Sequence, residues 1–145
     1  MHNVIGFKER RYIEELRILT KSIAIDCIVD DGFDRIIYVV KKGDMGLAIG
    51  KNGDNIRRMQ RVLGRRIEMV EEGGSFDEFV RNTLRPIDVL KTEADPDTER
   101  TRIVIKKKGD LGIAIGRGGC NVEKVRLLCR RMYNAEVTDI VAEGE

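Results

Sequence analysis

The sequence has few of the side chains that most enzyme sites use. Its 145 residues include one histidine, three cysteines, two prolines and no tryptophan. The histidine is His2, and the cysteines form no CxxC pair, so a zinc site of the Cys/His kind is excluded. The odd number of cysteines argues against a disulfide framework and favours a reducing cytoplasm. We therefore expect a cytoplasmic, non-enzymatic protein with no catalytic residue, no metal and no cofactor.

Long apolar runs and aromatic side chains are also scarce. No apolar run approaches the length of about 18 residues that suggests a membrane span, so no membrane contact is expected. Residues 1–11 lack the apolar segment of a signal peptide. Three tyrosines and four phenylalanines are the whole aromatic complement, which argues against a nucleic-acid site built on aromatic stacking.

One stretch occurs twice. Residues 41–56 read "KKGDMGLAIGKNGDNI" and residues 107–122 read "KKGDLGIAIGRGGCNV", and ten of the sixteen positions are identical at an offset of 66. At one of the differing positions, inside the glycine loop, Lys51 of the first copy corresponds to Arg117 of the second, so both loops carry a cation there. Repeats of this kind indicate repeated structural units. We expect two small domains, residues 1–73 and 74–145.

Positive charge gathers around both copies of the repeat, although the net charge of the chain is only +2. Residues 41–66 hold eight lysines and arginines against two acids, and residues 100–131 hold ten against two. A local basic patch on a nearly neutral protein is typical of a polyanion-binding face. A solvated helix face is the alternative interpretation.

Each half shows the same succession of patterns. Apolar spacing predicts helices at 8–20, 56–63, 76–84 and 122–132, and strands at 22–30, 35–40, 65–71, 87–93, 100–107 and 135–143. In the first strand, Ile23, Ile25, Cys27 and Val29 alternate and should share one face. The motif Ser75–Glu78 is a capping box that opens a helix.

The glycine loop allows three interpretations. A nucleotide-binding P-loop is disfavoured because Met45 stands where its first glycine belongs and Asn52 where its Ser/Thr belongs. A plain turn accounts for the glycines but not for a cation repeated at the same position. A nucleic-acid clamp accounts for both, because glycines let a phosphate backbone approach closely and the following helix begins with free amides.

The stretches "AIGKNGDNI" and "AIGRGGCNV" resemble the core signature of KH domains. The order of elements before each copy resembles the type II topology, α-β-β-α-α-β. The resemblance implies an α+β fold of two tandem type II KH domains, each with a three-stranded sheet and helices packed on one face. Two such units with a short joint resemble the paired KH region of the NusA transcription factors, in their small archaeal form.

The resemblance implies that both loops clamp single-stranded RNA. The implied phosphate contacts are Lys51 and Arg117 with the amides of Asn52, Gly53, Gly118 and Gly119, in loops that begin at Gly50 and Gly116. The implied groove walls, for which a core role is the alternative, are Ile49, Ile56, Ile115 and Val122. Further implied cations are Arg57, Arg58, Lys124 and Arg126. For Asn55 and Asn121 we favour capping over base recognition.

The resemblance also implies partners and a role. It implies an RNA-binding factor in transcription elongation, termination or antitermination, with RNA polymerase or its elongation complex as a second partner. An RNA-binding adaptor in ribosome assembly, RNA processing or RNA decay is the alternative. We expect a monomer whose two halves pack together.

Overall fold

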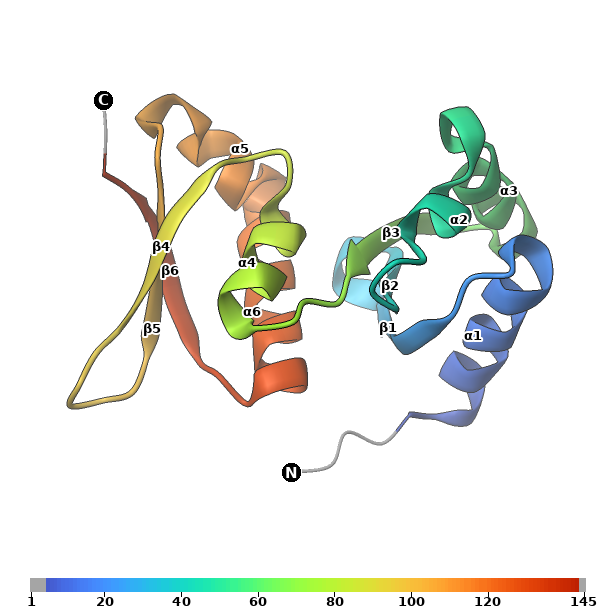
Figure 1. Cartoon of the computed structure of the whole chain (residues 1–145), viewed down its shortest axis with the longest axis horizontal. Helices are drawn as coiled ribbons and strands as arrows, with labels where there is room; N and C mark the ends of the chain where they lie inside the picture. The colour runs from blue at the N-terminus through green and yellow to red at the C-terminus, as the bar shows by residue number, and fades with distance from the viewer. Residues whose placement is uncertain (1–4, 144–145) are drawn as a thin grey trace. The chain divides into compact units, whose positions relative to one another are not determined.

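The structure, a computed structural model, describes residues 5–143. These residues divide into two compact units, with the boundary between Glu72 and Gly73. Each unit holds a three-stranded sheet and follows the order α-β-β-α-α-β, with short 3-10 turns between some elements (Figure 1). The mixed α+β class predicted from the sequence is confirmed, and the predicted helices and strands occur within a few residues of their expected bounds.

The first unit places its glycine loop on a crossover between two parallel strands. Its elements are α1 (Phe7–Thr20), β1 (Ala24–Asp30), β2 (Arg35–Val40), α2 (Met45–Ile49), α3 (Asp54–Leu63) and β3 (Arg66–Glu71). The central strand β2 runs antiparallel to β1 and parallel to β3. Parallel neighbours cannot be joined by a hairpin, so the chain must cross over between them. The helices α2 and α3, with the loop between them, form that crossover.

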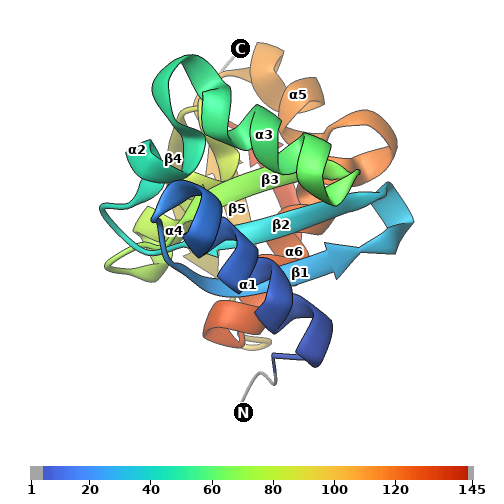
Figure 2. The same ribbon diagram turned by 90° about the vertical axis from the view of Figure 1, so that its right-hand side faces the viewer.

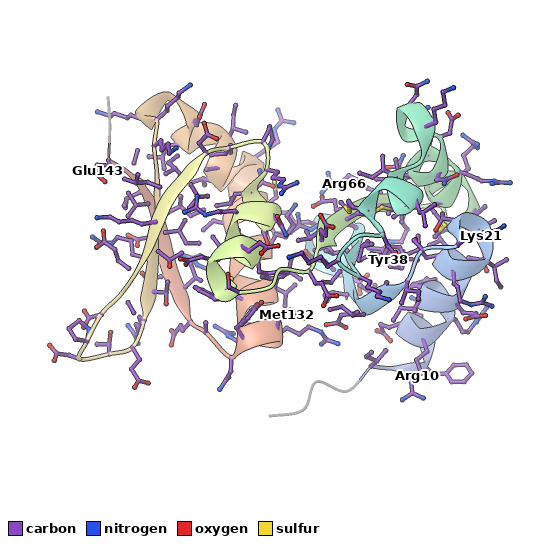
Figure 3. The ribbon with its side chains drawn as sticks, in the orientation of Figure 1. Arg10, Lys21, Tyr38, Arg66, Met132 and Glu143 are labelled. Carbon is purple, nitrogen blue, oxygen red and sulfur yellow. The ribbon has the colours of Figure 1, made fainter. Side chains whose placement is uncertain are left out.

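Helices cover one face of the first sheet (Figure 2). Leu16 of α1, Ala48 of α2 and Met59 of α3 are fully buried in one core cluster with side chains of β1, β2 and β3. Tyr38 of β2 belongs to the same cluster and is labelled in Figure 3. Its hydroxyl donates to the carbonyl of Tyr12 at 2.7 Å, and burial raises the pKa of this phenol above its ordinary range. The short helix α2 buries Ala48 completely, and its first residue, Met45, packs against the same cluster while partly buried.

The predicted alternation in β1 is wrong at its beginning. The pairing of β1 with β2 shifts register between Ala24 and Asp26. A bulge of this kind changes which side chains face inward on either side of it. As a result Ala24 and Cys27 lie in the core cluster, whereas Ile23 is 45% exposed.

The second unit repeats this arrangement. Its elements are α4 (Phe76–Leu84), β4 (Val89–Ala94), β5 (Thr101–Ile105), α5 (Leu111–Ile115), α6 (Cys120–Tyr133) and β6 (Val137–Ala142). The central strand β5 is antiparallel to β4 and parallel to β6, so α5, its loop and α6 again form the crossover. Figure 1 shows α4 and α6 on the same side of this sheet. The predicted cap is present, because the Ser75 hydroxyl accepts from the Glu78 amide at 3.2 Å.

The core of the second unit also buries one alanine of its short helix, and Leu111 of that helix packs against the core while partly buried. Ala114 of α5 is fully buried in a cluster with Val80 of α4, Val125 of α6 and the strand residues Ile103 and Ile105. Ala114 stands at the position of Ala48 in the repeat. Both loops therefore leave their units from a short helix that is held at the same point.

Candidate nucleic-acid interface

The two glycine loops have the same backbone conformation. Gly50 has φ 78° and ψ 170°, and Gly116 has φ 79° and ψ 166°. The third loop position is left-handed in both copies, with φ 55° at Asn52 and φ 65° at Gly118. Asparagine is one of the few residues besides glycine that adopts this conformation readily. The difference between Asn52 and Gly118 therefore leaves the loop shape unchanged.

The first glycine of each loop is required by the loop itself. A Cβ on Gly50 would lie 2.7 Å from Cγ of Asn55, and one on Gly116 would lie 2.7 Å from Sγ of Cys120. Their φ and ψ angles also fall in a region that is essentially restricted to glycine. The turn interpretation therefore explains these two glycines. It does not explain the exposed cation that follows each of them.

A repeated asparagine fastens each loop to the helix before it. The side-chain amide of Asn55 donates to the carbonyl of Leu47 at 2.8 Å, and that of Asn121 donates to the carbonyl of Ile113 at 2.7 Å. These carbonyls lie in the last turn of α2 and α5, where no further backbone amide of the helix is available. The favoured capping role of Asn55 and Asn121 is confirmed, although they cap the preceding helix and not their own.

Two of the four amides expected to meet phosphate have partners inside the loop. The amide of Gly53 donates to the carbonyl of Gly50 at 3.1 Å, and that of Gly119 donates to the carbonyl of Gly116 at 3.0 Å. These bonds close each loop into a 3-10 turn, which the sequence pattern does not reveal. The expectation of free amides is wrong at these two positions.

The loop cations and the helix cations differ in their surroundings. Lys51 and Arg117 are exposed, and neither has an ion pair within the residues that the structure describes. Arg57 pairs with Asp54 at 2.6 Å on the exposed first turn of α3. Arg58 is exposed as well. The loop cations are therefore more available to a bound anion than Arg57.

The two implied cations of α6, Lys124 and Arg126, are less exposed than Arg57 and Arg58 of α3. Lys124 is half-buried. The guanidinium of Arg126 pairs with Glu123 at 2.6 Å and donates to the carbonyls of Val137, at 3.3 Å, and Thr138. Arg126 thereby ties α6 to β6. Its expected role as a phosphate contact conflicts with this structural role, which has no signature in the sequence of α6.

The expected groove walls lie at different depths. Ile49 and Ile56 are half-buried, and Ile115 is 37% exposed. Val122 is only 8% exposed and belongs to the core cluster of the second unit, which matches the core role considered as its alternative.

Two exposed apolar residues beside the loops were missed by the sequence reasoning. Leu47 of α2 is 50% exposed and Ile113 of α5 is 64% exposed. They occupy the same position of the repeat, three residues before the first loop glycine. A recurring apolar pair is visible in the sequence, but only the structure reveals that its members face solvent.

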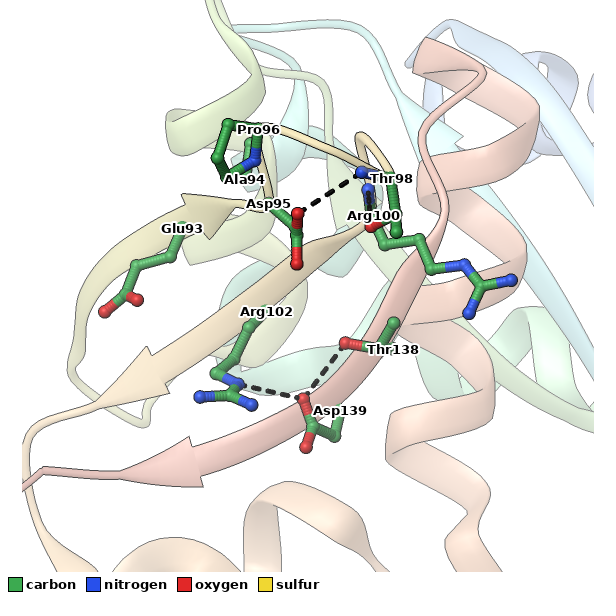
Figure 4. Close-up of a pocket in the computed structure, with 9 residues that line it drawn as sticks. All are labelled: Glu93, Ala94, Asp95, Pro96, Thr98, Arg100, Arg102, Thr138 and Asp139. Atoms are coloured by element: carbon green, nitrogen blue, oxygen red, sulfur yellow. Dashed lines mark hydrogen bonds and ion pairs between the residues drawn. The ribbon is translucent and has the colours of Figure 1, made fainter.

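Away from the loops, the described residues contain a hollow of about 530 Å³ over the open face of the second sheet (Figure 4). Arg102 and Asp139 pair across it at 3.4 Å, and Asp139 accepts from Thr138 at 3.1 Å. Its lining residues are Glu93, Ala94, Asp95, Pro96, Thr98, Arg100, Arg102, Thr138 and Asp139. Three acids against two arginines make this hollow a poorer site for a polyanion than the loops.

The described residues offer little for other kinds of chemistry. They contain no group of three or more histidine, cysteine or acidic side chains that could hold a metal ion. None of the helices in this part of the chain is long and apolar enough to cross a membrane. Burial raises the pKa of the Cys129 thiol to about 12, so this cysteine is not poised as a nucleophile.

Comparison with known proteins identifies the family. The profile named "KH domain" matches residues 9–74. The "Probable transcription termination protein NusA" of Halobacterium salinarum is 32% identical over 127 residues, which cover 88% of this chain and 90% of that protein. The chain belongs to the NusA-like family of KH-domain proteins. The recognition made from the repeat is thereby confirmed.

Other members of the NusA-like family match over different lengths. The protein of the same name from Methanocaldococcus jannaschii is 34% identical over 122 residues, 83% of this chain and 66% of that protein. The "Transcription termination/antitermination protein NusA" of Thermus thermophilus is 31% identical over 100 residues, 66% of this chain and 26% of that protein. A solved structure titled "Crystal structure of APE1850" has 32% identity and a TM-score of 0.81, covering 96% of this chain and all of that one.

Proposed function

We propose that this NusA-like chain is a cytoplasmic factor in transcription elongation, termination or antitermination. In this proposal its two units are tandem type II KH domains that bind single-stranded RNA through their glycine loops. One observation carries the proposal: two loops of the same conformation each expose a cation directly after their first glycine. The geometry of a turn does not require a cation at that position, whereas binding of a phosphate does.

Electrostatics support RNA as the ligand. Lys51 and Arg117 are exposed on loops that internal hydrogen bonds close, so little backbone order has to be gained when a phosphate binds. Contacts to phosphate fix the register of the strand but do not read its sequence. Two binding loops on one chain also provide linked sites, and linked sites that engage one ligand together bind it more tightly than either alone.

Apolar contacts supply the other half of the proposed site. Ile49 and Ile56 flank the first loop, and Ile115 flanks the second, all with partly exposed side chains. Such side chains can contact bases of any sequence. Arg58 and Lys124 remain second-tier phosphate contacts in this proposal, while Val122 and Arg126 act by supporting the fold.

The names of the relatives support the biological role. Archaeal members are named as probable transcription termination proteins, and the bacterial member is named as a termination and antitermination protein. We extend this role to the present chain, with RNA polymerase or its elongation complex as the second partner and the chain itself a monomer. Co-purification with polymerase and not with ribosomal particles is the result expected from this role.

Binding of a single-stranded RNA of about 12 nucleotides, followed by fluorescence anisotropy at several salt concentrations, tests the proposal. Each phosphate contact to a single strand contributes about −0.7 to the slope of log K against log salt concentration. The two contacts at Lys51 and Arg117 therefore predict a slope of about −1.4 or steeper. The matching duplex should bind more weakly. No binding to the single strand at low salt would contradict the proposal.

A further inference from the structure

An open hollow lies in the first unit, at the end of α3 that is far from the glycine loop. Figure 2 shows this end of α3 beside the turn between β1 and β2. The hollow has a volume of about 480 Å³, which lies in the range of about 300–1,000 Å³ found for binding clefts. Its lining residues, which we call the Phe33 hollow, are Phe33, Asp34, Gln60, Gly64, Arg65 and Arg66.

Phe33 supplies the aromatic surface of this hollow and is held from behind. The guanidinium carbon of Arg35 lies 4.9 Å from the centre of the Phe33 ring, a cation–π arrangement. Arg35 is fully buried, and its guanidinium pairs with Asp30 at 2.8 Å and with Glu68 at 3.4 Å. A ring that is positioned in this way loses little freedom when a partner covers it, so the entropic cost of binding is small.

The rim of the Phe33 hollow carries charges of both signs. Arg65 pairs with Asp31 at 3.0 Å and with Asp34 at 3.1 Å, and the side chains of these two acids are 84% and 88% exposed. Arg61, in the last turn of α3, is exposed and forms no ion pair within residues 5–143. Aromatic residues and arginine are enriched in protein interfaces, whose rims are polar. A nucleic-acid strand fits this surface less well, because the exposed acids repel its phosphates.

The second unit does not repeat this surface at the matching positions, although it repeats the glycine loop. At the offset of 66, Leu127 stands where the first unit has Arg61. The turn between β4 and β5, residues 95–100, contains no aromatic residue to correspond to Phe33. The features that support RNA binding recur in both units. A surface that is confined to the first unit therefore indicates a separate partner.

We propose that the first unit docks on RNA polymerase through the Phe33 hollow, with an apolar side chain of the polymerase against Phe33 and a polymerase carboxylate paired with Arg61. The inference rests on the proposed function, which includes polymerase as the second partner, and it assigns that contact to a place on this chain. Gly64 follows Gly53 by eleven residues, about 17 Å along the axis of α3, so docking there leaves the first glycine loop open to RNA.

The variant Arg61→Glu tests this with purified RNA polymerase from the organism that encodes the chain. Affinity for the polymerase, measured by biolayer interferometry at about 0.15 M salt, should fall about tenfold or more, because arginine is enriched among the residues that dominate binding and the new carboxylate repels its partner. Affinity for the 12-nucleotide RNA should stay within about twofold. Arg61 lies about 12 Å along α3 from Gly53, beyond the screening length of about 8 Å.

The matched control is Arg130→Glu, which makes the same change of charge on an exposed arginine in the last turn of α6. It should bind polymerase as the wild type does. A second variant, Phe33→Ser, removes the ring and should also weaken polymerase binding, with the urea unfolding midpoint to show whether the fold is kept. If Phe33→Ser unfolds, Arg61→Glu decides, because its side chain is exposed and unpaired within the described part of the chain.

Three results would overturn the inference. Polymerase binding by Arg61→Glu within twofold of the wild type, or an equal loss in Arg130→Glu, would show that the docking surface is wrong, while the RNA-binding loops would be unaffected. A tenfold loss of RNA affinity at unchanged polymerase affinity would make the hollow an RNA contact instead. If the wild type binds the RNA but not the polymerase, the inference falls together with the polymerase partner, and RNA binding by the loops stands.

Discussion

Replacing Gly50 by alanine should lower the free energy of unfolding of the first unit, because alanine fits neither the backbone conformation nor the space at this position. Gly50 has φ 78° and ψ 170°, a backbone region that is essentially restricted to glycine. The added Cβ would also lie 2.7 Å from Cγ and 2.8 Å from Nδ2 of Asn55. The alanine therefore strains the backbone and displaces the amide that caps α2 at Leu47.

These two effects set the expected size of the change. A residue held in such a backbone region costs about 1–3 kcal/mol. Loss of the hydrogen bond from Asn55 to the carbonyl of Leu47 adds about 1 kcal/mol. The free energy of unfolding of the first unit should fall by about 2–4 kcal/mol, a large share of the roughly 5–15 kcal/mol that stabilises a typical domain.

Urea unfolding of the full chain measures the change, with amide exchange in β2 to report on the first unit. Gly64→Ala is the matched control, because Gly64 has φ 69° but open space around its Cβ position. That variant should lose only about 1–2 kcal/mol from left-handed strain. If Gly50→Ala is no more destabilising than Gly64→Ala, the contact with Asn55 does not hold the loop.

Two further predictions concern the ionisable core and the cysteines. Burial raises the pKa of Cys129 to about 12 and raises that of Tyr38 as well, so the folded state retains protons that the unfolded chain releases. The free energy of unfolding should be constant below about pH 8.5 and should fall as the pH rises from there toward 12. The fall should be shallower in the variant Cys129→Ala. An equal fall in that variant would exclude the Cys129 thiol as a cause. Cys120 is half-buried whereas Cys27 and Cys129 are buried, so a thiol reagent should label one cysteine per native chain, and prompt labelling of all three would contradict the packing of both cores.

Elements whose signals are local could be predicted from the sequence. The helix N-cap at Ser75 and the apolar spacing of α3 each depend on neighbouring residues, and each is present in the structure. The repeat added the position of both loops, since the same pattern at an offset of 66 requires the same local geometry.

Features that depend on contacts between distant segments could not be predicted. The sequence pattern predicts Arg126 as a surface cation of a helix. Its guanidinium instead donates to two carbonyls of β6, eleven and twelve residues further along the chain. The bulge at Ala24 follows from pairing with β2 and has no signature in β1 itself. The exposure of Leu47 and Ile113 follows from the orientation of the short helices, which turn Ala48 and Ala114 toward the cores. The contacts of Arg126 and the exposure of Leu47 and Ile113 change the candidate site, whereas the bulge changes only the first core.

Charge reversal inside both loops tests the central claim most directly. The variant changes Lys51, Asn52, Arg117 and Gly118 to aspartate. Asn52 adopts φ 55° at the position where Gly118 has φ 65°, so aspartate, which also tolerates this conformation, should leave both loops folded. With an unchanged circular dichroism spectrum, the variant should lose measurable affinity for the 12-nucleotide RNA and with it the salt dependence. Wild-type affinity and slope in the folded variant would contradict the assignment of the glycine loops as the RNA-binding site.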